Sequence, residues 1–165
     1  ASETDNIEAM NNLIEWLPKN IPDDDETTIV HGDYRLDNMI LRNNEVIGIL
    51  DWELSTLGHP IADFSYHCLS WRTQEAFWDE AKLKELGIPS EKEYMEMYCK
   101  YSGKDLSKNW EFYMAFNMFK IAGILQGILG RVRDGTAASK HAEERGNMVF
   151  PLSQAAWETI EDNFL

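Results

Sequence analysis

Strand-like segments are confined to one short stretch of this 165-residue chain, and helical patterns occupy most of the remainder. Residues 27–30 form a short β-branched run. Residues 39–41 and 46–50 form two more apolar runs, and the Asn-rich turn between them is typical of a β-hairpin. The sequence therefore predicts a mainly helical α+β fold, in which a small hairpin is inserted in a helical body.

Helical segments are predicted on both sides of the hairpin. Residues 7–17 carry apolar side chains at helical spacing, after a possible capping box from Ser2 to Asp5, and prolines at 18 and 22 end that helix. Residues 107–130 are apolar on nearly all sides, which is typical of a central buried helix. Further helices are predicted over residues 61–71 after Pro60, over 73–86, from the Ser90–Glu93 capping box to Gly103, and over 138–164 with a kink or a break that Pro151 forces near Phe150.

Composition bounds the class of protein. Six Trp, six Tyr and seven Phe exclude a disordered chain, and the length predicts one domain over residues 1–165. Cys68 and Cys99 are too few for a disulfide scaffold, and with no secretory leader they favour an intracellular, most simply cytoplasmic, location. The apolar stretch of residues 121–130 is too short to span a bilayer and contains Gln126.

Charge argues against two classes of partner. Fifteen Lys and Arg against 29 Asp and Glu give a formal net charge of -14. Such a surface repels nucleic acid phosphates and anionic lipids, so we expect neither nucleic acid nor a membrane as a partner. Most of this acidic excess is explained by solubility.

The residues that carry chemistry lie around the hairpin, in the runs HGDYRLDN (31–38) and ILDWE (49–53). Asp33 and Asn38 bracket a loop between two short strands, and the hairpin returns Asp51 beside that loop. Two carboxylates and an amide oxygen form a hard-oxygen site suited to Mg²⁺. If Asp33 lies just off the metal, it can accept a proton from a hydroxyl group, as phosphoryl transfer requires.

These two runs resemble the motifs of the aminoglycoside phosphotransferase/choline kinase family, which has a protein-kinase-like fold. The run LDWELSTLGHP looks closest to the kinase-like domains found with acyl-CoA dehydrogenases. The resemblance implies that Asp33 is the catalytic base or hydroxyl-orienting residue, that Asn38 and Asp51 bind Mg²⁺, and that ATP is the phosphoryl donor. It also implies that Asp63 is a structural acid bracing the loop, with His59 where an acid is more usual.

The resemblance further implies that the chain corresponds to the C-terminal lobe of such a fold. Residues 27–64 would form the catalytic loop and metal-binding hairpin, and residues 65–165 a helical subdomain. No glycine-rich nucleotide loop or strand lysine precedes His31, so we expect the N-terminal lobe as a missing partner. The isolated chain is then expected to transfer phosphate poorly or not at all.

The substrate class follows from spacing. Only nine residues separate Glu53 from Asp63 and no A-P-E follows, so a protein-kinase activation segment does not fit. A small-molecule hydroxyl is therefore favoured over a protein side chain. The acceptor remains open between an amino sugar, an amino alcohol such as choline and a hydroxylated acyl group. Two rival functions are a non-catalytic kinase-like binding module and a metal-dependent phosphoester hydrolase.

Several nearby residues have simpler interpretations. His31 is expected to be a structural imidazole bonded to backbone, Arg35 to pair with an acid, and Asp37 to be a solvated loop acid. Roles in packing or helix stability are expected for Trp52, Cys68, Arg131 and Arg133, and for the aromatic residues Trp71, Trp78, Tyr94, Trp110 and Tyr113, whereas His59, His67 and His141 are given none.

Overall fold

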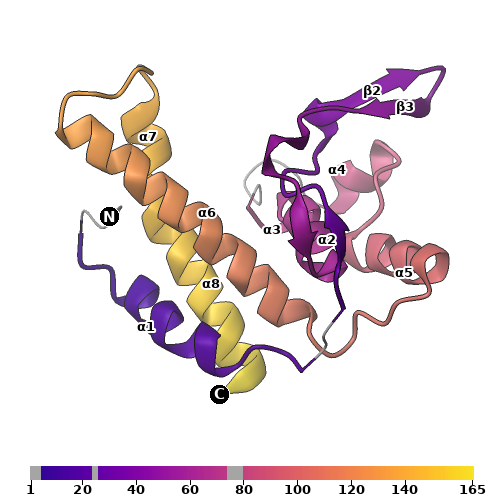
Figure 1. Cartoon of the computed structure of the whole chain (residues 1–165), viewed down its shortest axis with the longest axis horizontal. Coiled ribbons are helices and arrows are strands. Elements are labelled where there is room, and N and C mark those ends of the chain that lie inside the picture. Colours follow the sequence, from indigo (N-terminus) through magenta and orange to yellow (C-terminus); the bar gives the residue numbers. More distant parts are fainter. Residues whose placement is uncertain (1–4, 24–25, 74–79) are drawn as a thin grey trace. The chain divides into compact units, whose positions relative to one another are not determined.

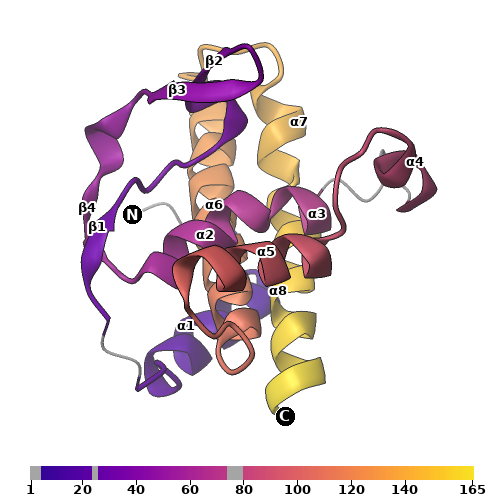
Figure 2. The ribbon, with the colours of Figure 1, turned by 90° about the vertical axis from the view of Figure 1, so that its right-hand side faces the viewer.

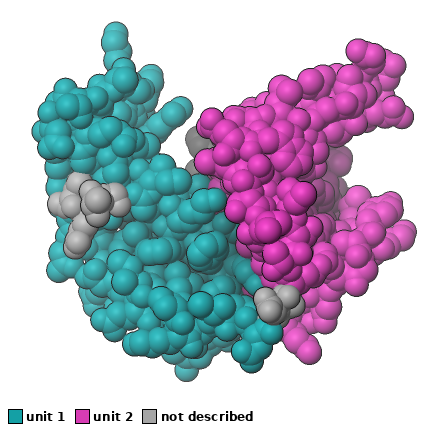
Figure 3. Space-filling view, in the orientation of Figure 1, with its two compact units in different colours: residues 1–23, 111–165 teal, residues 24–110 magenta. Residues whose placement is uncertain are grey.

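The computed structural model describes residues 5–23, 26–73 and 80–165 (Figure 1). The chain forms two compact units, which Figure 3 shows in different colours. Unit 1 contains residues 1–23 and 111–165, and unit 2 contains residues 24–110. The predicted internal division after residue 64 does not coincide with either boundary. The reason is that unit 1 combines residues from both ends of the sequence, whereas unit 2 lies between them. Local sequence patterns do not indicate that two segments so far apart in the chain pack together.

Unit 1 is a helical bundle made from both ends of the chain. Helix α1 (Glu8–Trp16) packs against α8 (Val149–Phe164), as Figures 1 and 2 show. The Trp16 ring contacts Phe112 of α6 (Trp110–Arg133) and Phe164 of α8, with ring centroids 6.1 and 5.1 Å apart. The short helix α7 (Ala142–Asn147) completes the unit. Its fully buried side chains include Leu13, Met114, Met118, Val149 and Ile160.

Unit 2 carries the strands. The described residues form two two-stranded antiparallel sheets, β1 (Thr28–Val30) with β4 (Thr56–Gly58) and β2 (Met39–Arg42) with β3 (Glu45–Ile49). Helix α2 (Pro60–Cys68) follows β4 directly. Strand β4 was not predicted, because its three residues show no period in the sequence and become a strand only by pairing with β1. The other helices are α3 (Ser70–Thr73), α4 (Glu80–Glu85) and α5 (Glu91–Ser102).

The hairpin and two helix ends confirm specific local signals. Asn43 and Asn44 both have left-handed backbone (φ 51° and 63°), the conformation that a tight two-residue hairpin turn requires. The capping box of Ser90 and Glu93 is present at the start of α5. Gly103 ends that helix with φ 72°. The mainly helical α+β class is therefore confirmed.

Other boundaries differ from the prediction. Helix α1 begins at Glu8, and its N-cap is Ile7, which provides no side-chain cap. Ser2 of the expected capping box lies outside the described residues. The expected helix over 61–71 is interrupted at Leu69, and of the expected helix over 73–86 the described residues show Glu80–Glu85, while 74–79 lie outside them.

Proline and the long helix account for two further differences. The break between α7 and α8 falls at Met148, because Pro151 fits in the first turn of α8, where a helix needs no N–H donor. Helix α6 has 24 residues and, by length and composition, could cross a membrane, although half of its most apolar window is buried within the structure. Ile124 is about half exposed (53%), so α6 is not buried on all sides as predicted.

Candidate active site

The loop that joins β1 to β2 is fixed by the first turn of α2. The Asp63 carboxylate accepts the backbone N–H of His31 through Oδ2 and that of Gly32 through Oδ1, both at 2.8 Å. A carboxylate at this end of a helix is also stabilised by the helix dipole. The expected role of Asp63 as the brace of the loop is therefore confirmed.

Gly32 is required by the close approach of two backbone segments. Its φ is +82°, and an added Cβ would lie 2.6 Å from the carbonyl oxygen of Leu54. Leu54 belongs to the 3₁₀ turn Trp52–Leu54 that follows Asp51. No other residue fits here without a shift of backbone, so the loop and this turn are held in a fixed relation.

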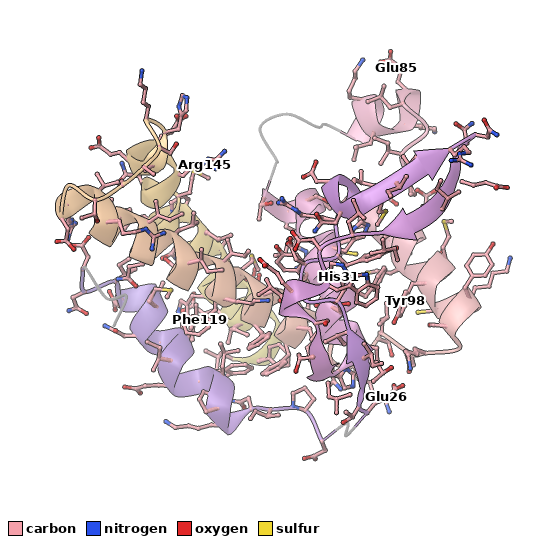
Figure 4. The ribbon with its side chains drawn as sticks, turned by 45° about the horizontal axis from the view of Figure 1, so that its top comes forward. Glu26, His31, Glu85, Tyr98, Phe119 and Arg145 are labelled. Atoms are coloured by element: carbon pink, nitrogen blue, oxygen red, sulfur yellow. The ribbon has the colours of Figure 1, made fainter. Side chains whose placement is uncertain are left out.

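His31 connects the loop to the end of β3. Its Nδ1 accepts the backbone N–H of Asp33 at 3.3 Å, so the ring proton lies on Nε2, which donates to the Leu50 carbonyl at 2.8 Å. The ring is buried and packs against Trp52, with centroids 4.8 Å apart (His31 is labelled in Figure 4). The expectation of a structural imidazole bonded to backbone is confirmed.

The Asp33 carboxylate is held at both of its oxygens. Oδ1 accepts the Tyr66 hydroxyl at 2.7 Å, and Oδ2 accepts Nδ2 of Asn38 at 3.0 Å, with Nε of Arg35 at 3.6 Å. Desolvation acts to raise the pKa of Asp33, but the two hydrogen bonds and the charge of Arg35 outweigh it, so the pKa lies below its usual value. Asp33 is therefore an ionised, oriented acceptor.

Asn38 and Asp51 lie at the same end of the hairpin, just before β2 and just after β3. Asn38 donates Nδ2 to the Asp33 carbonyl at 2.9 Å as well, which leaves Oδ1 as the side-chain atom for a cation. Its own carbonyl accepts the N–H of Leu50 at 2.8 Å, so Asp51 follows one residue later. Asp51 is exposed and has left-handed backbone (φ 62°). Within the described residues, no hydrogen bond joins its carboxylate to Asp33 or Asn38.

This donor set fits Mg²⁺ as a partial ligand set. In the described part of the chain, no three His, Cys, Asp or Glu side chains gather as a metal site. Asn38 and Asp51 would supply one amide oxygen and one carboxylate, and Mg²⁺ commonly completes such a pair with waters and substrate phosphates. The ligand roles of Asn38 and Asp51 stay predictions.

Two residues with contacts at the site, Tyr66 and His67, were missed. Tyr66 holds Asp33, and His67 donates Nδ1–H to the Tyr34 carbonyl at 3.2 Å while Nε2 accepts the Tyr94 hydroxyl at 3.1 Å. Asp63, Tyr66 and His67 are spaced i, i+3, i+4, which places them on one face of α2. Since Asp63 was already assigned to the loop, this spacing was the available signal. His59, also given no role, caps α2 by accepting the Ile61 N–H at 3.2 Å.

The simpler interpretations of the remaining residues agree with the structure. Arg35 lies 3.6 Å from Asp33 and 3.7 Å from Asp37, whose side chain is 78% exposed. Cys68 and Cys99 are free, and burial raises the pKa of the Cys68 thiol. The predicted aromatic residues pack within their units where they are described, Trp71 on Tyr94, Trp110 on Phe64 and Tyr113 on Phe112, while Trp78 lies outside the described residues.

Comparisons with known proteins define the class to which this chain belongs. The model of the phosphotransferase enzyme family matches residues 1–98, and the chain therefore belongs to that family. Among curated proteins, acyl-CoA dehydrogenase family member 10 of Mus musculus is 44% identical over 165 residues, and the match covers 96% of this chain and 15% of that protein. Acyl-CoA dehydrogenase family member 11 of Homo sapiens is 38% identical, with 99% and 22% covered.

A solved structure supports the same family assignment. The crystal structure of a candidate aminoglycoside phosphotransferase from Ralstonia eutropha is 47% identical and matches with a TM-score of 0.88. The match covers 98% of this chain and 51% of that one. The chain thus spans about half of this solved relative and less than a quarter of the two curated ones. The resemblance inferred from the two motifs is confirmed.

Proposed function

We propose that this chain is the catalytic-loop part of a small-molecule kinase, which transfers the γ-phosphoryl group of ATP to a hydroxyl group with the help of Mg²⁺. The observation that carries the proposal is the Asp33 carboxylate, ionised and held at both oxygens next to the hairpin end that bears Asn38 and Asp51. Family membership supports phosphoryl transfer as the reaction class.

Each residue has one role in this proposal. Asp33 accepts a hydrogen bond from the acceptor hydroxyl, orients its oxygen toward the γ-phosphorus, and takes the proton as the new P–O bond forms and the bond to the ADP oxygen breaks. A carboxylate of low pKa suits this role, because a loose transition state needs orientation more than a strong base. Asn38 and Asp51 would hold Mg²⁺, which neutralises phosphate charge when bound.

We further propose a second lobe as partner. Ten of the large hydrophobic side chains that are exposed in the structure lie between residues 29 and 57, on both sheets and the turns beside the site. Ile29, Leu36 and Leu57 are each at least 70% exposed. Apolar surface of this extent is typical of an interface. The occupant we propose is the nucleotide-binding lobe that the family resemblance implies, and the solved Ralstonia relative, of which this chain covers 51%, has length for such a lobe.

The test is MgATP turnover by the longest natural product that carries these 165 residues, with an aminoglycoside, choline and a hydroxyacyl-CoA as separate acceptors. Asp33→Asn should lower kcat at least about a hundredfold, because the hydroxyl loses its proton acceptor. Asp37→Asn is the matched control: it removes an exposed carboxylate from the same loop and should retain the parental rate.

The outcomes separate the rival functions. Acceptor-dependent ADP release that Asp33→Asn abolishes supports the kinase. Phosphate release that no acceptor stimulates would assign a hydrolase instead. If the parent shows no turnover and Asp33→Asn behaves identically in every assay, the proposal fails and a binding module is the better interpretation.

A further inference from the structure

We propose that Tyr66 is the positioning residue for Asp33: its hydroxyl fixes the plane of the carboxylate so that one lone pair faces the acceptor hydroxyl. The inference rests on the proposed function and extends it to a residue on α2, which no motif of the loop contains. Its basis is the 2.7 Å bond from the Tyr66 hydroxyl to Oδ1 of Asp33.

The carboxylate is held from two separate elements. Tyr66 holds Oδ1 from α2, and Asn38 holds Oδ2 from the 3₁₀ turn Leu36–Asn38. Two bonds to different oxygens prevent rotation about the bond between Cβ and the carboxyl carbon, which either bond alone would permit. Each carboxylate oxygen still has a lone pair for the substrate.

Helix α2, which carries Tyr66, makes further hydrogen bonds to the loop. Tyr66 lies one turn after Asp63, whose carboxylate bonds the backbone of His31 and Gly32, and one residue before His67, which bonds the Tyr34 carbonyl. The helix thus contacts the loop on both sides of Asp33. Burial, with the nearby Asp33 charge, raises the pKa of Tyr66 to about 12, so the phenol stays protonated and the bond keeps its direction from tyrosine to carboxylate.

Without the Tyr66 hydroxyl, the carboxylate would be held only by Asn38 and attracted by Arg35, whose Nε lies 3.6 Å from Oδ2. A rotated carboxylate would still ionise but would no longer face the acceptor. The expected consequence is a lower kcat with little change in the KM for ATP, because Asn38 and Asp51, the residues proposed to hold Mg²⁺ and with it the nucleotide, are unchanged.

The experiment compares Tyr66→Phe with Tyr98→Phe in the same full-length product and assay. Tyr98 of α5 (labelled in Figure 4) is the matched control, because its ring stacks on Phe64 of α2 with the ring centroids 3.8 Å apart. Among the described residues, the side-chain hydrogen bonds to the Asp33 carboxylate come from Tyr66 and Asn38 and not from Tyr98. Tyr66→Phe should lower kcat about tenfold and move the acidic limb of kcat/KM to higher pH, since the lost bond had stabilised the charged Asp33. Tyr98→Phe should do neither.

A second readout needs no activity. The carboxyl carbon of Asp33, assigned with Asp33→Asn, is titrated by NMR, and its midpoint should rise in Tyr66→Phe alone. If the kinetics of Tyr66→Phe and Tyr98→Phe are equal while Asp33→Asn is inactive, the positioning role is overturned and the kinase stands. If Asp33→Asn turns over like the parent, the proposed function fails. Separately, an NMR midpoint for Asp33 that is the same in Tyr66→Phe as in the parent would exclude the hydrogen bond from Tyr66 to Asp33.

Discussion

The loop of residues 31–38 and the helical unit 1 are stabilised by different kinds of interaction. In the loop, Asp63, Tyr66 and His67 of α2 each make a directed polar bond to a loop residue. In unit 1, α1 packs against α8, and these helices bury apolar side chains such as Leu13 and Ile160, neither of which has exposed surface. The loop therefore depends on exact geometry, whereas unit 1 depends on filled volume. Changes of shape should damage the first, and changes of size the second.

The largest effect is expected at Gly32. In Gly32→Ala, the added Cβ would meet the Leu54 carbonyl oxygen in a left-handed backbone, and relief requires a shift of main chain. We expect a loss of more than about 3 kcal/mol in the free energy of unfolding, measured by urea titration. Gly103→Ala is the control, since it has the same kind of backbone (φ +72°) with nothing within 4 Å, and should cost about 1 kcal/mol. Equal losses in the two variants would contradict the close approach.

The dependence of unit 1 on filled volume is tested at Leu13. Leu13→Ala should cost about 3 kcal/mol, because it leaves a cavity between α1 and its neighbours. Hydrogen exchange should accelerate in α1 and α8 while the loop of unit 2 stays protected. Ile14→Ala, at the adjacent position with 55% of the side chain exposed, should cost less than about 1 kcal/mol. If exchange in the loop accelerates as much as in α8, the two regions are not independent.

The two regions also differ in how far they could be predicted from sequence. The loop, hairpin and caps were predictable, because Asn43 and Asn44, the Ser90–Glu93 box and Asp63 act on neighbours close in sequence or in a known motif. The pairing of α1 with α8 was not, since a helical stripe specifies that a face is buried but not its partner. Strand β4 was missed for a similar reason, as only its pairing with β1 makes it a strand.

In the candidate site, too, the sequence predicted some of the contacting residues and not others. Asp33, Asn38 and Asp51 were predicted to converge. Asp33 and Asn38 do so, through the bond from Nδ2 to Oδ2, whereas the convergence of the Asp51 carboxylate with them stays a prediction. Tyr66 was missed because a tyrosine on an apolar helix is usually core, and its direction becomes informative only once Asp63 has fixed which face of α2 meets the loop. His67 was missed for the same reason.

The smallest effect is expected at His67, where polar geometry and burial act together. Desolvation lowers its pKa, and the bond to the Tyr34 carbonyl and the charge of Asp63 only partly oppose this, so the folded state takes up the proton less readily than the unfolded chain. Its contribution to stability is therefore complete above pH 6.5, the ordinary value, and declines as pH falls from there toward the lower folded value.

The test is the pH dependence of the free energy of unfolding in His67→Gln, whose side-chain amide can still donate to Tyr34. From pH 7.5 to 9 the curves of parent and variant should run parallel. Below pH 6.5 the parent should lose stability relative to the variant, so the two curves converge or cross. Parallel curves through the acidic range would mean that His67 takes up its proton without cost, and that the α2 face holds the loop without excluding water from its histidine.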